Sequence, residues 1–204
     1  MPYYDKPIGK GGYKIVWAND FDLNATLTYR KYFGDHVVHG DIVKIMDDVK
    51  AAVKSKKELP HSFPKPGTVD VVTGGFPCQP FSKGGAQKGM SEQTQGTLFH
   101  EIMRIIEARR PPLVVLENVA NLVGHDEGRT WNTIIKALRD AQYAVDAEPL
   151  LISPHEIKKA RGGAPQNRPR VYIVAVDSTK GLKVPDNSNL LDAADWRTAT
   201  SPAW

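Results

Sequence analysis

The chain of 204 residues is 41% hydrophobic and 25% charged, which is enough apolar material for one compact core and argues against disorder throughout. No apolar run approaches the roughly 18 residues of a membrane span, and the polar, proline-bearing residues 1–10 lack the features of a targeting signal. The six histidines show no spacing that would build a metal site, and the formal net charge of +4 suits a polyanionic partner.

The first third of the sequence alternates strand and helix patterns. Hydrophobic periodicity predicts strands over residues 13–18 and 36–39, and helices over residues 24–33 and 45–59. We assign Asp22 to the amino cap of the first helix, which leaves Asp20 as a candidate ligand. An acid at the end of the first strand of dinucleotide-binding folds accepts ribose hydroxyls, and the adjacent Phe21 can stack on adenine.

The only cysteine, Cys78, follows the next predicted strand, residues 68–72. Gly74 and Gly75 are expected to turn the backbone sharply after this strand, and Pro77 restricts the backbone beside the thiol. This setting is typical of a nucleophile held at the rim of a sheet. The alternative is a buried structural cysteine, which is the commoner role of a lone thiol, but the flanking residues favour the nucleophile.

The second half of the sequence continues the alternation. Hydrophobic patterns predict helices over residues 97–109 and 131–140, a strand over 111–116, and an edge pair of antiparallel strands formed by 143–152 and 171–176. The order implies an α/β fold with a mainly parallel sheet and helices on both faces. Glu117 follows its strand directly, and Arg168 and Arg170 precede the last one. Cys78 and Glu117 would therefore face one crevice if their strands are neighbours.

Five short motifs occur in register along the chain. They are Ala18-Asn-Asp-Phe-Asp22, Pro77-Cys78-Gln79, Gly96-Thr-Leu-Phe99, Glu117-Asn118-Val119 and Gln166-x-Arg168-x-Arg170. Together they resemble the DNA (cytosine-5)-methyltransferase family, from about residue 16 to about residue 176. The resemblance implies a Rossmann-like fold that uses S-adenosylmethionine and acts on double-stranded DNA. It makes residues 13–177 the catalytic domain and residues 178–204 a polar tail.

The resemblance also implies three catalytic residues. Cys78 would add as a thiolate to C6 of a flipped cytosine, because C5 alone is too poor a nucleophile to take a methyl group. Glu117 would donate or share a proton at N3, and Arg170 would bind O2, where negative charge develops. The sequence does not identify the base that later removes the C5 proton.

Further residues are assigned to ligands by the same resemblance. The cofactor residues would be Asp20, Phe21, Asp41, Ile42, Pro77 and Leu98. The DNA contacts would be Gln79, Ser82, Asn118, Gln166 and Arg168. The glycine- and lysine-bearing residues 83–95 would close over the flipped base, with an ordinary surface loop as the alternative.

The sequence departs from the family pattern at both ends. The glycine-rich first motif and the target-recognition domain have no counterpart, and Pro2 and Pro7 argue against a central strand in the N-terminal remnant, residues 1–12. We therefore expect an incomplete fold, whose missing parts would come from a second polypeptide, from a longer natural chain or from a rearranged order of segments. Without these parts, the chain should bind cofactor weakly. The lone thiol favours a reducing compartment, and we expect a cytoplasmic protein of bacterial or phage type.

Other functions remain open at this level. A catalytically silent DNA-binding or regulatory relative would keep the fold without the chemistry, although retention of Cys78, Glu117 and Arg170 favours an enzyme. A cysteine hydrolase is a more distant alternative, because no histidine is tied to the thiol by a recognisable motif. The target DNA sequence and the oligomeric state cannot be read from these residues.

Overall fold

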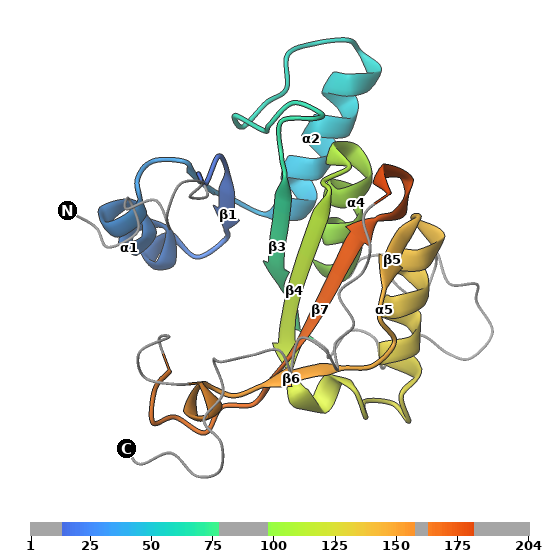
Figure 1. The fold of residues 1–204 in the computed structure, drawn as a ribbon. Helices are drawn as coiled ribbons and strands as arrows, with labels where there is room; N and C mark the ends of the chain where they lie inside the picture. Colours follow the sequence, from blue (N-terminus) through green and yellow to red (C-terminus); the bar gives the residue numbers. More distant parts are fainter. Residues whose placement is uncertain (1–13, 78–97, 158–162, 182–204) are drawn as a thin grey trace. The chain divides into compact units, whose positions relative to one another are not determined.

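The computed structural model describes residues 14–77, 98–157 and 163–181, and the chain divides into two compact units (Figure 1). The first unit is Met1–Val69 and the second is Asp70–Trp204. Each unit is described by itself below. Among the described residues, no helix combines the length and the apolar character that crossing a membrane requires.

The first unit contains two strands and two helices. In chain order they are β1 (Ala18–Asp20), α1 (Leu23–Phe33), β2 (Val37–His39) and α2 (Ile42–Lys54). The strands pair in parallel, with Asp20 opposite His39. Both helices begin at an aspartate cap: Asp22 accepts a hydrogen bond from the Ala25 amide at 2.8 Å, and Asp41 accepts one from the Val43 amide at 2.9 Å. The predicted cap at Asp22 is confirmed.

The second unit is built on a five-stranded sheet. Its strands and α-helices are β3 (Val71–Gly75), α4 (Leu98–Arg109), β4 (Leu113–Val119), α5 (Arg129–Asp140), β5 (Tyr143–Val145), β6 (Leu150–Ile152) and β7 (Arg170–Asp177). The strand order is β3-β4-β7-β5, and β6 also pairs with β7. β3 and β4 are parallel, whereas β7 is antiparallel to β4, β5 and β6. All strands of this sheet except β7 therefore run in one direction.

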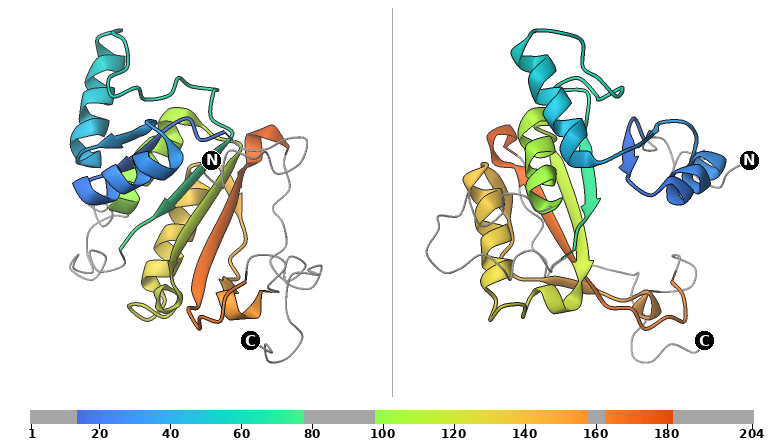
Figure 2. Two further views of the ribbon diagram at one scale, coloured as in Figure 1. Left: turned by 90° about the vertical axis from the view of Figure 1, so that its left-hand side faces the viewer. Right: turned by 180° about the vertical axis from the view of Figure 1, so that it is seen from behind.

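Helices α4 and α5 lie against one face of this sheet (Figure 2). The alternation along β4 explains the core, because Val114 and Leu116 are fully buried while their neighbours are only partly covered. Phe99 and Ile106 of α4 belong to the same cluster of buried side chains. The predicted core positions Ile106 of α4 and Ile134, Ile135 and Leu138 of α5 are buried, whereas Leu98, which the same spacing places on the core face of α4, is exposed.

Several predicted boundaries shift for identifiable reasons. The first strand is Ala18–Asp20 rather than residues 13–18, and α2 begins at Ile42 because Asp41 caps it there. β4 begins only after Pro111 and Pro112, which have no N–H for the ladder, and it extends through Glu117. The predicted edge strand 143–152 is two strands, and Pro149 lies between them. β7 is not an edge strand, because it pairs with β4 on one side and with β5 and β6 on the other.

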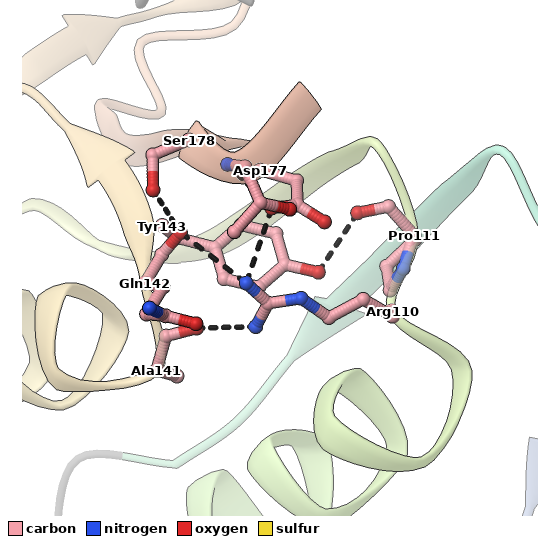
Figure 3. Close-up of polar contacts among 8 residues, drawn as sticks. Arg110, Pro111, Ala141, Gln142, Tyr143, Asp177 and Ser178 are labelled. Atoms are coloured by element: carbon pink, nitrogen blue, oxygen red, sulfur yellow. Dashed lines mark hydrogen bonds and ion pairs between the residues drawn. The ribbon is translucent and has the colours of Figure 1, made fainter. Parts of the chain in front are cut away.

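A polar network joins the ends of β4 and β7 that lie away from Glu117 (Figure 3). Arg110 pairs with the buried carboxylate of Asp177 at 3.1 Å and donates to the carbonyl of Ala141. Its guanidinium also lies 4.9 Å from the ring centroid of Tyr143, whose hydroxyl donates to the Pro111 carbonyl at 2.8 Å. Burial raises the pKa of Tyr143 to about 12, so the phenol stays protonated as a donor.

Asp177 is the charged centre of this network. Burial by itself would raise the pKa of its carboxyl, but hydrogen bonds from Thr179 and the charge and hydrogen bond of Arg110 outweigh burial and hold the pKa below its ordinary value. The Thr179 hydroxyl donates to Asp177 Oδ1 at 2.6 Å, and the Thr179 amide donates to the same oxygen at 3.0 Å. The carboxylate is therefore stabilised in its ionised form in the folded state.

This depressed pKa gives a prediction for stability. The contribution of Asp177 should be present above its unfolded pKa of about 3.9 and lost as the pH falls through the lower folded value. Asp177→Asn should therefore lower the free energy of unfolding at pH 7, and the deficit should shrink in acid. Urea denaturation between pH 7 and pH 3 measures this. Asp140→Asn, which breaks the exposed Lys136 pair, is the control and should change stability by less than about 1 kcal/mol. A deficit that grows in acid would contradict the prediction.

Candidate active site

Glu117 and Arg170 form an ion pair whose geometry follows from strand register. In the antiparallel ladder of β4 and β7, Glu117 lies opposite Tyr172 and Arg170 lies opposite Val119. The two charged residues are thus diagonal neighbours on the same face, a separation that long side chains can bridge. Arg170 Nε donates to Glu117 Oε1 at 2.9 Å. The Arg170 and Glu117 side chains are 19% and 38% exposed, so a ligand can reach the pair.

Gly75 provides room for the Glu117 carboxylate. It lies opposite Glu117 in the parallel pair of β3 and β4, and a Cβ built on it would be 3.5 Å from Glu117 Oε2. At Gly74, a Cβ would be 3.0 Å from Ile102 Cδ1 of α4. The prediction that these glycines turn the chain is wrong, since both lie within β3. Gly74 allows the close approach of Ile102, whereas a Cβ at Gly75 would make only an ordinary contact with the Glu117 carboxylate.

Asn118 is directed to the opposite face of β4 from Glu117. Its side chain is 4% exposed, and Nδ2 donates to the Phe76 carbonyl at 2.6 Å while Oδ1 accepts from the Val119 amide at 2.8 Å. The Phe76 ring is itself buried and lies 5.2 Å from that of Phe99. Phe76 is therefore fixed through its ring and its carbonyl, two residues before Cys78 in the sequence. Asn118 holds this backbone rather than exposing its amide to a ligand.

The buried amide of Asn118 can be tested by its effect on stability. Asn118→Ala should lower the free energy of unfolding by about 1–3 kcal/mol, because the Phe76 carbonyl and the Val119 amide both lose their partner. Urea denaturation measures this, with the exposed Asn132→Ala of α5 as the control that stays within about 0.5 kcal/mol. A contact of Asn118 with DNA alone would instead leave stability unchanged and reduce DNA binding.

The other candidate residues of the second unit fall into two groups. Pro77, Leu98, Gln166 and Arg168 are described and exposed, so each is accessible to a ligand. Cys78, Gln79, Ser82 and the segment 83–95 lie outside the described residues, and their predicted roles are not tested. Among the described residues, no group of three or more histidine, aspartate or glutamate side chains could hold a metal ion.

In the first unit, two carboxylates follow neighbouring strands. Asp20 ends β1, and Asp41 comes two residues after β2, its parallel partner. Asp20 Oδ1 accepts from the Asp22 amide at 2.9 Å, and Asp41 Oδ1 caps α2. Each carboxylate has a second oxygen, which these bonds do not use. Phe21 is 77% exposed beside Asp20, while Ile42 is half-buried.

These carboxylate acceptors and the exposed aromatic ring fit the adenosine part of S-adenosylmethionine. Carboxylate oxygens accept hydrogen bonds from ribose hydroxyls, and an exposed aromatic ring can stack on a purine. Asn19, which the sequence interpretation did not single out, supports the arrangement. Its side-chain amide donates to the carbonyls of Val38 and Gly40, at 2.9 Å each, and so ties the ends of β1 and β2 together.

The structure resembles known methyltransferases in fold. A putative DNA modification methyltransferase encoded within a prophage (E. coli) superposes with a TM-score of 0.59 at 20% identity, over 86% of this chain and 43% of that one. The sheet and its helices thus define a methyltransferase fold.

Sequence comparison defines the family within that class. The model of the C-5 cytosine-specific DNA methylase family matches residues 7–198, and the chain belongs to this family. It is 56% identical over 159 residues to the type II methyltransferase M.AluI of Cellulosimicrobium cellulans, covering 78% of this chain and 28% of that protein. It is 42% identical over 165 residues to M1.ScrFI of Lactococcus lactis subsp. cremoris, covering 80% of this chain and 36% of that protein. The chain thus spans about a third of the length of these relatives.

Proposed function

We propose that the chain carries out the central chemistry of a DNA (cytosine-5)-methyltransferase, with Cys78, Glu117 and Arg170 as its catalytic residues. The observation that carries the proposal is the Glu117–Arg170 ion pair at the carboxyl end of β4. The neighbouring strand β3 leads into Phe76 and Pro77, and the next residue in the sequence is the only cysteine. A carboxyl group, a guanidinium and a thiol are the three groups that attack at C6 of cytosine requires.

The proposed reaction begins with bond formation between the Cys78 sulfur and C6 of the cytosine. The electrons of the C5–C6 double bond then make C5 nucleophilic, and negative charge spreads toward N3 and O2. Glu117 shares a proton at N3, and Arg170 donates hydrogen bonds to O2. Bound S-adenosylmethionine supplies the methyl group that C5 takes. A base then removes the C5 proton, and the sulfur leaves C6 as thiolate.

The ion pair holds the Glu117 and Arg170 side chains close together before substrate binds. Arg170 orients the Glu117 carboxyl group before substrate arrives, and Gly75 leaves that group free of a neighbouring side chain. A preformed array needs little reorganisation as charge develops, and such preorganisation is a large part of catalysis. A cytosine ring placed between the two side chains would exchange their mutual hydrogen bond for bonds to N3 and O2.

Cofactor and DNA contacts are proposed from the same assignments. In the first unit, Asp20, Phe21, Asp41 and Ile42 would bind S-adenosylmethionine. The cofactor roles predicted for Pro77 and Leu98 of the second unit remain predictions. The DNA contacts would come from Gln79, Ser82, Gln166 and Arg168, with the cytosine swung out of the duplex. The exposure of Arg168 and Gln166 and the net charge of +4 support this part of the proposal. Asn118 is better explained by its buried hydrogen bonds.

We further propose that a second polypeptide supplies the glycine motif and the recognition domain, and that the protein acts in the cytoplasm. Among the described residues, β3 pairs with a strand on one side only, and β1 pairs only with β2. Unpaired strand edges favour the addition of a strand from elsewhere.

Covalent trapping tests the proposed chemistry. The chain would be co-expressed with the parts of M.AluI that lie outside the matched region, and incubated with S-adenosylmethionine and DNA carrying 5-fluorocytosine, whose C5 fluorine cannot be removed as a proton. We expect a denaturation-resistant adduct with the wild type and none with Cys78→Ser. Glu117→Gln should slow adduct formation by about 10²- to 10⁴-fold, the usual contribution of general acid catalysis. The exposed Glu127→Gln is the matched control. An adduct that survives Cys78→Ser would place the nucleophile elsewhere, and no adduct at all would favour the silent relative.

Cofactor binding tests the assignment of Asp20. Asp20→Ala should weaken S-adenosylmethionine binding to the complemented protein by about tenfold or more, because a hydrogen bond to a charged group contributes about 1.5–3 kcal/mol. Isothermal titration calorimetry measures the affinity, and the exposed Asp35→Ala is the control of equal charge change. Equal affinities for the wild type and Asp20→Ala would remove Asp20 from the cofactor site.

A further inference from the structure

The ladder between β6 and β7 is interrupted next to Arg170. Ile152 is the last residue of β6 and lies opposite Arg170, the first residue of β7. The residue before Arg170 is Pro169, which has no N–H to continue the ladder. Arg170 is the first residue of β7 paired with β4 and β6, so the residues before it must be held by other contacts. Those contacts affect how the Arg170 side chain is presented.

Ser153 supplies a side-chain acceptor just beyond the end of this ladder. It follows β6 directly, it is 2% exposed, and its Oγ accepts a hydrogen bond from the Arg168 amide at 2.9 Å. The same hydroxyl lies 2.7 Å from His155 Nδ1 and 3.5 Å from the Gln166 carbonyl. A buried side chain thus binds the first N–H before the proline. The contact bridges 15 residues of sequence.

Ser153 directly precedes a short 3-10 helix, η3 (Pro154–Glu156), and the segment before β7 contacts this helix as well. We call residues 163–170 the arginine segment. The Ala164 amide donates to the Pro154 carbonyl at 3.1 Å. Gly163 lies so close to the Ile157 carbonyl that any Cβ would overlap it. With the Ser153 contact, the arginine segment is anchored near its beginning and again two residues before Arg170.

Two explanations of Ser153 can be separated. The side chain of Glu156 accepts from the Ser153 amide at 3.0 Å, which is one half of a capping box around η3. A pure capping role would make Ser153 important for η3 alone. The hydroxyl, however, receives an N–H from the arginine segment, and this bond lies outside the capping box. Glu156 and Ser153 therefore offer matched substitutions that affect the cap and the segment differently.

We propose that Ser153 is a positioning residue for Arg170 and Arg168: its hydroxyl holds the arginine segment so that Arg170 meets Glu117 before substrate binds. The proposal rests on the function proposed above for this ion pair. It adds a residue outside the catalytic motifs, Ser153, on which the position of Arg170 depends. Glu117 is placed by the interior of a long ladder, whereas Arg170 is at the start of its strand and depends on the segment before it.

The first test measures the ion pair without any activity. The Nε–H signal of Arg170 in a nitrogen–hydrogen NMR spectrum would be assigned with Arg170→Lys, and its exchange with solvent followed. Ser153→Ala should speed exchange of this proton and of the Arg168 amide about five- to tenfold, which corresponds to the net loss of one hydrogen bond. Ser153→Thr keeps the hydroxyl and should retain protection. Unchanged exchange in Ser153→Ala would overturn the proposal, and so would equal acceleration in Glu156→Ala.

The second test is a double-mutant cycle on single-turnover methylation by the complemented protein. Ser153→Ala alone should lower the rate constant by about 10- to 100-fold, the loss expected when a catalytic group is displaced by about 1 Å. In an Arg170→Ala background it should lower the rate by no more than about twofold, because residues that act through one group are not additive. Ser178→Ala, at the other end of β7, is the control.

The two tests also separate this proposal from the function on which it rests. Full additivity of Ser153→Ala and Arg170→Ala would contradict the positioning role while leaving the methyltransferase proposal intact. If the complemented wild type does not methylate DNA, the proposed function fails. The exchange measurement then still decides whether Ser153 holds the Glu117–Arg170 pair.

Discussion

The antiparallel pairing of β7 with β4 is the constraint on which the rest of the second unit depends. The ladder joins seven residue pairs, from Leu113 opposite Val176 to Val119 opposite Arg170. Because side chains alternate along a strand, this one register decides two things together. It puts Glu117 and Arg170 on the same face, and it turns Val114, Leu116 and Asn118 toward the helices. A slip of β7 by one residue would move Arg170 to the opposite face of the sheet from Glu117 and expose the inward-facing residues of β7.

The two ends of this ladder are stabilised in different ways. At one end, Arg110 and Thr179 bind the buried carboxylate of Asp177, and Arg110 also lies over the Tyr143 ring. The contacts of this network are made between residues of the chain. At the other end, the Glu117–Arg170 pair is partly exposed and could exchange its mutual bond for bonds to a ligand. An ion pair that is partly open to solvent contributes little to stability. The second pair is therefore better explained by ligand binding than by folding.

The sequence predicted the elements and the conjunction of Glu117 with Arg170, but not how they are held. Apolar spacing was sufficient for α4 and α5, because each of these helices buries one face, whereas α1 was located by its cap at Asp22. The prediction that Gly74 and Gly75 turn the chain was wrong, because a glycine inside a strand and a glycine in a turn look alike in a single sequence. Ser153 was readable in part, since a serine followed three residues later by Glu156 is a capping signature. Its bond to the Arg168 amide spans 15 residues, and no local pattern encodes it.

Gly75 offers an argument for a site kept for chemistry rather than for stability. Glycine in a strand is unfavourable by roughly 0.5–1 kcal/mol relative to alanine, and nothing about the core requires it here, because the nearest atom to a Cβ at this position is Glu117 Oε2. A silent relative that kept only the fold would gain by replacing this glycine. The chain has the glycine beside Glu117, and Ser153 holds the segment that leads into Arg170. Both features bear on the position of one carboxylate and one guanidinium.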